Sequence, residues 1–152
     1  MRPFRTLVAW LLFAAHTSYG AELTVYNHVS GASSPLDASV SEHFSKRYRV
    51  VDFSDKDHTW VFPKGVGEHR PPPPAYLESR CVSGQALVAY VISSDGRVTE
   101  AYAAKSTNEF LGELAVHLMS ERRFFPGQLD GRSVPSLAVT NMRFTCPGVE
   151  AK

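Results

Sequence analysis

Residues 85–92, with the sequence QALVAYVI, and the turn SSDG at residues 93–96 decide the fold. The strand that this stretch predicts is apolar on both faces, with Ala86, Val88, Tyr90 and Ile92 on one and Leu87, Ala89 and Val91 on the other. A strand of this kind is typical of the middle of a sheet. The Asp-Gly pair in the turn favours a tight hairpin, so residues 97–105 are expected to return as a second, antiparallel strand.

A helix and a third strand are predicted to follow. Asn108 is a suitable N-cap for a helix over residues 109–122, whose apolar side chains gather on one side. Turn signals at residues 126–131 precede a long strand over residues 134–146. A right-handed crossover through the helix gives the strand order 2-1-3. The predicted fold is therefore α+β: a small three-stranded antiparallel/mixed sheet with one helix packed on one face, in the order β-β-α-β.

The first twenty residues, MRPFRTLVAWLLFAAHTSYG, have the features of a secretory signal peptide. Arg2 and Arg5 precede an apolar run over residues 7–15, which is too short to span a bilayer. Small residues at the end favour cleavage after Gly20. The sequence therefore predicts an exported protein, and an N-terminus that stays uncut would instead act as an anchor.

Residues 21–74 are predicted to form an N-terminal extension. Its β-branched and aromatic runs at residues 48–53 and 59–62 are separated by a charged stretch, which favours a hairpin with a five-residue loop. Four consecutive prolines at residues 71–74 predict a stiff linker. Residues 75–148 then form the second unit, which contains the strands and helix described above.

Because the protein is predicted to be exported, its two cysteines are expected to have a structural role. Cys81 precedes the first predicted strand and Cys146 ends the third, and in the strand order 2-1-3 these two ends lie side by side. In an oxidising compartment two cysteines in one small domain most simply form a disulfide. We therefore predict a Cys81–Cys146 disulfide.

Composition and motifs exclude several classes of function. Removal of Arg2 and Arg5 with the signal peptide changes the formal net charge from +1 to −1, which gives no electrostatic basis for binding nucleic acid. The histidines have no metal-ligand spacing, and the acidic loop at residues 52–57 lacks the glycine and glutamate of a calcium-binding loop. No nucleophile elbow or phosphate-binding loop is present. The sequence predicts no enzyme, no metal and no cofactor.

Residues 74–144 resemble the C-terminal domain of TonB-like energy transducers. The resemblance rests on the order and spacing of Gly84-x-Ala86-x-Val88-x-Tyr90-x-Ile92, Asp95-Gly96-x-Val98, Arg123-Phe124-x-Pro126, Gly131-x-x-Val134 and Met142-x-Phe144. It implies a periplasmic protein that captures a short segment of an outer-membrane receptor by strand addition, and that takes part in energised transport if its N-terminus remains anchored.

The predicted strand order leaves one side of the third strand free from Val134 to Phe144. A row of unpaired backbone groups can accept another chain as an added strand. The expected partner contacts are Leu137, Val139, Asn141 and Arg143. The alternative is that residues 48–62 or a second copy cover this edge, in which case the protein is a structural or assembly factor of the cell envelope.

Overall fold

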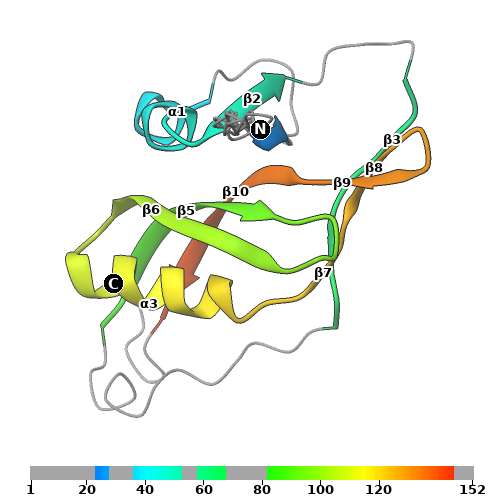
Figure 1. The fold of residues 1–152 in the computed structure, drawn as a ribbon. Helices are drawn as coiled ribbons and strands as arrows, with labels where there is room; N and C mark the ends of the chain where they lie inside the picture. Colours follow the sequence, from blue (N-terminus) through cyan, green and yellow to red (C-terminus); the bar gives the residue numbers. More distant parts are fainter. Residues whose placement is uncertain (1–22, 28–35, 53–57, 68–81, 146–152) are drawn as a thin grey trace, which may run out of the picture.

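The computed structural model describes residues 23–27, 36–52, 58–67 and 82–145. Two helices and a series of strands occur within these ranges (Figure 1). In chain order they are β1 (Leu23–Asn27), α1 (Ala38–Ser45), β2 (Tyr48–Asp52), β3 (Trp60–Val61), β4 (Lys64–Gly65), β5 (Gly84–Ile92), β6 (Val98–Ser106), α3 (Glu109–Ser120), β7 (Phe124–Phe125), β8 (Gly127–Leu129), β9 (Arg132–Val134) and β10 (Ser136–Phe144).

The main sheet has the order β2-β1-β10-β5-β6. The part β10-β5-β6 is antiparallel and has the predicted order, with the strand that is apolar on both faces in the middle. The prediction of three strands and one helix is incomplete, because β1 and β2 extend the sheet as parallel strands and α1 adds a second helix. The fold is thus α+β with a mixed five-stranded sheet.

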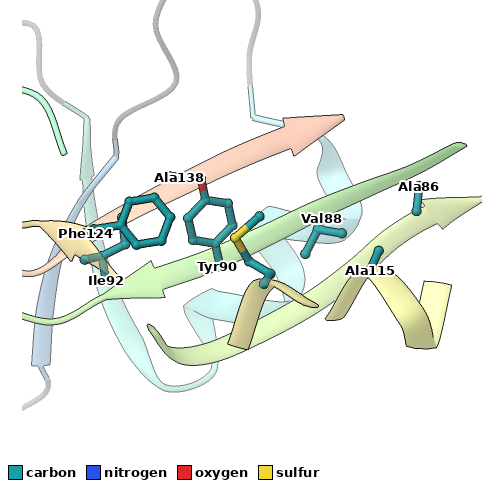
Figure 2. Packing of buried hydrophobic residues seen from close by; sticks show 8 residues of the cluster. Ala86, Val88, Tyr90, Ile92, Ala115, Phe124 and Ala138 are labelled. Atoms are coloured by element: carbon teal, nitrogen blue, oxygen red, sulfur yellow. The ribbon is translucent and has the colours of Figure 1, made fainter. Parts of the chain in front are cut away.

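Helix α3 covers one face of the sheet (Figure 1). Its N-cap is Asn108 as predicted, since the Asn108 side chain accepts a hydrogen bond of 2.9 Å from the backbone N–H of Leu111. Ala115 and Met119 of the helix pack on alternate residues of β5, and the Tyr90 and Phe124 rings lie 5.5 Å apart beside them (Figure 2). This face holds the larger part of the core.

Helix α1 covers part of the opposite face. Asp37 caps the helix, and its buried residues Val40 and Phe44 are four positions apart, which places them on one side. They pack with Val25 of β1 and with residues of β5 and β10 that point away from α3, namely Ala89, Val91, Leu137 and the half-buried Val139. The sheet therefore has a core on each face.

The predicted hairpin of residues 48–53 and 59–62 is wrong. The first run forms β2, which pairs with β1, whereas Trp60 and Val61 of β3 pair with β8 in a separate small sheet of order β3-β8-β9. Strand β4 pairs with β7. The expected turn at Asp130-Gly131 does join β8 to β9, with φ of 51° and 76° at its two residues.

Several predictions fall outside the described residues. These are the signal peptide at residues 1–20, the proline run at 71–74 with the boundary that follows it, and Cys81 and Cys146. They stay predictions from the sequence. Within the described ranges, neither helix has the length and apolar character needed to cross a membrane.

Candidate functional site: the outer edge of β10

The side of β10 that faces away from β5 is closed only at its beginning. Here β1 runs parallel to β10, with Tyr26 opposite Ser136 and Asn27 opposite Leu137. Leu137 is paired and fully buried, so it does not belong to an open edge. The expectation of an edge free from Val134 onward is corrected in this part, and the covering strand is β1 rather than residues 48–62.

From Ala138 to Phe144 no other described strand pairs with this side of β10. Three of the four predicted contact residues lie here. Val139 is half-buried against the α1 core, whereas Asn141 and Arg143 are exposed. The open stretch thus begins directly after the last residue that β1 covers.

Backbone geometry decides which groups this stretch presents. The N–H of Tyr26 donates to the carbonyl of Pro135 at 3.1 Å, so the backbone carbonyl of Pro135 points toward β1. Along a strand these directions alternate, and residues 137, 139, 141 and 143 therefore point the same way. The even-numbered residues of β10 bond to β5 instead. Val139, Asn141 and Arg143 consequently offer their backbone N–H and carbonyl groups at the open edge.

A groove lies beside the open edge, on the face of the sheet that α1 only partly covers. Its volume is about 330 Å³, and it is lined by Gln85, Leu87, Lys105, Ser106, Thr107 and Asn141. A neighbouring hollow of about 440 Å³ is lined by Gly84, Gln85, Thr107, Arg143, Phe144 and Thr145. Amide, hydroxyl and apolar side chains thus lie together beside the open edge, with one cation in each hollow.

Glu100 of β6 holds α1 and β2 over the covered half of this face. Its carboxylate lies 2.8 Å from Nε2 of His43 and accepts a hydrogen bond of 2.9 Å from the Tyr48 hydroxyl, and Arg47 approaches to 3.5 Å. The His43 ring stacks on Tyr102 with 4.0 Å between centroids. Burial raises the pKa of Glu100, but hydrogen bonds from Tyr48 and His43 and the charge of Arg47 outweigh burial, so the pKa is lowered overall.

A second polar contact fixes the start of α1. Asp37 pairs with Lys105 of β6 while it caps the helix through the backbone N–H of Ser39. The hydrogen bond from Lys105, followed by those from Ser39, lowers the pKa of Asp37 to about 2. Both ends of α1 are therefore tied to β6, and these contacts hold the covering layer, formed by β1, α1 and β2, on one face of the sheet.

Two elements that shape the site were not predicted, although the sequence contains a signal for each. Residues 23–27, LTVYN, are β-branched and aromatic like the other strands, but they precede a polar, turn-rich stretch. Asp37 followed by Val40 and Phe44 is an N-cap before a helical spacing of apolar residues. Among the described residues no group of three His, Cys, Asp or Glu side chains is placed to bind a metal.

Comparison with known proteins gives one kind of match. No family profile and no curated protein sequence matches the chain. Among solved structures, the chain is similar to the solution NMR structure of the TonB C-terminal domain of Pseudomonas aeruginosa, with 22% sequence identity, a TM-score of 0.43 and coverage of 64% of this chain and 95% of that chain. The similarity is to the family that the sequence motifs of residues 84–144 predicted.

Proposed function

We propose that this protein is a periplasmic, TonB-like partner-binding protein that adds an extended segment of an envelope protein to β10. The observation that carries the proposal is the open edge after Leu137, where three successive outward-facing residues have no described strand beside them. An added segment would continue the sheet in the position that β1 leaves at Asn27. By the sequence resemblance, the partner is a segment of an outer-membrane transporter.

Strand addition suits this site because the backbone provides the bonds. An extended peptide opposite Val139, Asn141 and Arg143 can form main-chain hydrogen bonds whatever its sequence, and adjacent side chains then select among peptides. The half-buried Val139 offers an apolar contact, and Asn141 and Arg143 offer polar ones. No catalytic group is needed for such a role.

Amide hydrogen exchange measured by NMR tests this proposal residue by residue. In the free protein, the amides of Thr140 and Met142 should be protected by β5, and those of Val139, Asn141 and Arg143 should exchange fast. A peptide taken from the N-terminal segment of an outer-membrane transporter of the same host should slow exchange at the three outward amides alone. Binding that leaves these amides unprotected would exclude strand addition.

The second candidate is a structural or assembly factor of the envelope. Strand β1 favours it, because it shows that the upstream residues already close part of the edge that a partner would use. Strand β2 then forms a new outer edge, through which a second copy could pair as a homodimer.

Oligomeric state and exchange together separate the two candidates. An assembly factor that dimerises through an edge should show a concentration-dependent mass in sedimentation, and slow exchange along β2 or at the odd residues of β10 without any added peptide. A monomer with fast exchange at Val139, Asn141 and Arg143 supports the partner-binding role instead.

A further inference from the structure

Residues 59–66 and 123–130 form one irregular two-stranded ribbon. Val61 pairs with Gln128 and Lys64 with Phe125, so the two pairings are three positions apart on each strand and the register is the same in both. The backbone N–H of Val66 extends the ladder by donating to Arg123 O at 2.9 Å. The ladder is interrupted at Pro63 and Pro126, which explains why it is divided into β3–β8 and β4–β7 (Figure 1).

The ribbon has an inner and an outer face at β4–β7. Phe124 points inward and is buried in the core with Tyr90. Side chains alternate along a strand, so Phe125 points outward, and its partner Lys64 lies on the same face. Val66 and Arg123 lie two positions beyond Lys64 and Phe125 along the ladder, so they share this outer face.

Large apolar side chains on this ribbon are exposed to an unusual degree. Phe125 is 60% exposed and Val66 45%, and Phe62, two residues before Lys64, is 52% exposed. Phe62 lies edge-on to Trp60, with 6.2 Å between ring centroids. Single exposed apolar residues are ordinary on protein surfaces, whereas several on one ribbon indicate an interaction surface.

Cations accompany these apolar side chains. Lys64 and Arg123 lie on the outer face, and Arg132 is exposed on the neighbouring β9. None of the ion pairs formed among the described residues uses any of the three. Two acidic groups nearby are engaged, since Asp95 pairs with Arg97 and Asp130 with His58. The face therefore presents available positive charge beside exposed aromatic and aliphatic groups.

We propose that this outer face docks onto an anionic phospholipid surface. Aromatic and aliphatic side chains enter the headgroup region, and lysine and arginine at the same level are attracted by anionic lipids. A lipid surface needs no matching pocket, and it accommodates apolar side chains that project singly from a strand ribbon. An acidic protein partner would use the cations but would gain less from Phe62, Val66 and Phe125.

The position of the ribbon is compatible with strand addition at β10. Gly127 of the ribbon lies against Ser136, at the start of β10, where a Cβ on Gly127 would be 2.4 Å from the Ser136 hydroxyl oxygen. The open edge begins only after Leu137 and runs away from the ribbon toward Phe144 (Figure 1). Docking through the ribbon would thus leave the open edge accessible to an extended segment.

Vesicle flotation tests the proposal, with protein purified from its host so that the N-terminus is the natural one. The probes are large unilamellar vesicles of phosphatidylcholine alone, and the same vesicles with about a quarter of phosphatidylglycerol. We compare the wild type with Phe62→Ser/Phe125→Ser and with Lys64→Glu/Arg123→Glu. The matched controls are Leu23→Ser, which removes an apolar side chain of equal exposure (52%) from β1, and Lys46→Glu/Arg49→Glu, which reverses two exposed charges outside the ribbon.

The wild type and both controls should float with the anionic vesicles and should float less at high salt. Lys64→Glu/Arg123→Glu should bind at least about tenfold more weakly, because each cation near an anionic surface is worth roughly a factor of five. Phe62→Ser/Phe125→Ser should also bind at least about tenfold more weakly, because each aromatic side chain that leaves water contributes roughly a factor of five or more. Absence of flotation of the wild type, or equal flotation of ribbon variants and controls, would overturn the proposal. So would ribbon-dependent binding to soluble polyglutamate without binding to vesicles, because that result assigns the surface to an acidic protein partner. Urea unfolding of each variant checks that it is folded.

Discussion

The two halves of β10 share one neighbour and differ in the other. Along its whole length β10 pairs with β5, but only Ser136 and Leu137 also pair with β1. Leu137 in the closed half is buried in the α1 core, whereas Asn141 in the open half is exposed and lines the groove on the same face of the sheet. The difference between the two halves arises from elements outside β10. Helix α1 is attached to β6 by the contacts His43–Glu100 and Asp37–Lys105, and β1, which packs with α1, ends at Asn27.

The largest expected effect comes from emptying the core beneath α1. Phe44→Ala removes a fully buried ring and should lower the free energy of unfolding by about 4 kcal/mol. Because the β1–α1–β2 layer loosens, the amide of Leu137, which β1 alone covers, should exchange as fast as that of Val139. The closed half would then resemble the open half.

Met119→Ala is the matched control for this change. Met119 is equally buried, but it packs on the α3 face. It should destabilise the protein by about 3 kcal/mol without selective exposure of Leu137. If both variants expose the Leu137 amide to the same degree, the covering layer is not an independent unit and the contrast between the halves is lost.

The predicted disulfide would act on the other end of β10. The β5–β10 pairing ends at Gly84 and Phe144, close in sequence to Cys81 and Cys146. Closing a loop of this length stabilises by up to about 4 kcal/mol in the chain-entropy description. Intact mass with and without reduction and alkylation should show one disulfide, and reduction should speed exchange near Met142 more than near Ser136. A native mass with two free thiols would refute the prediction.

A pair of proline substitutions tests the direction of the backbone groups in the open half. Thr140→Pro removes an N–H that points to β5 and should cost about 3 kcal/mol in unfolding free energy. Asn141→Pro removes an N–H that points outward, which edge strands tolerate, and should cost clearly less. Equal losses in urea unfolding would mean that β10 has no open side at residue 141. Asn141→Pro should also weaken peptide binding, since it deletes one donor of the added strand.

The part of the fold that was predicted from the sequence is the part in which each element is indicated by residues close together in the chain. Strand β5 is apolar on both faces, Asp95-Gly96 fixes the turn after it, and Asn108 marks the start of α3, so the order β6-β5-β10 follows from adjacent segments. The parallel pairing of β1 with β10 joins residues more than a hundred positions apart, and nothing local at Tyr26 or Ser136 indicates it. This is why the sequence did not predict that β1 closes the edge of β10 at Ser136 and Leu137.

The incorrect hairpin has a related cause. Two β-like runs separated by a charged stretch are typical of a hairpin, and residues 48–62 have that pattern. In the structure, Trp60 instead pairs with Leu129, as part of the ribbon formed by residues 59–66 and 123–130. Tyr48 pairs with Leu23 in the main sheet. The sequence pattern identified these segments as strands, but it did not determine which strands they pair with.

The smallest predicted effect concerns the attachment of α1 to β6 and its dependence on pH. The pKa of Glu100 is lowered from its ordinary value of 4.5, and that of Asp37 from 3.8 to about 2. A lowered carboxyl pKa contributes stability that is present above the ordinary value and lost as pH falls through the lowered one. Glu100→Gln removes the charge that His43 and Arg47 contact, and should cost about 1 kcal/mol at about pH 6. At a pH well below 4.5 the wild type and the variant should converge in urea unfolding, because Glu100 loses its charge in the wild type as the pH falls through its lowered pKa. Along this pH change the amide of Leu137 should lose protection before that of Thr140, since β5, which covers Thr140, does not depend on the attachment.

A cost of Glu100→Gln that is the same at both pH values would show that the carboxylate does not hold the layer by its charge. The boundary between the two halves of β10 would then rest on the packing of Phe44 and Val40 alone.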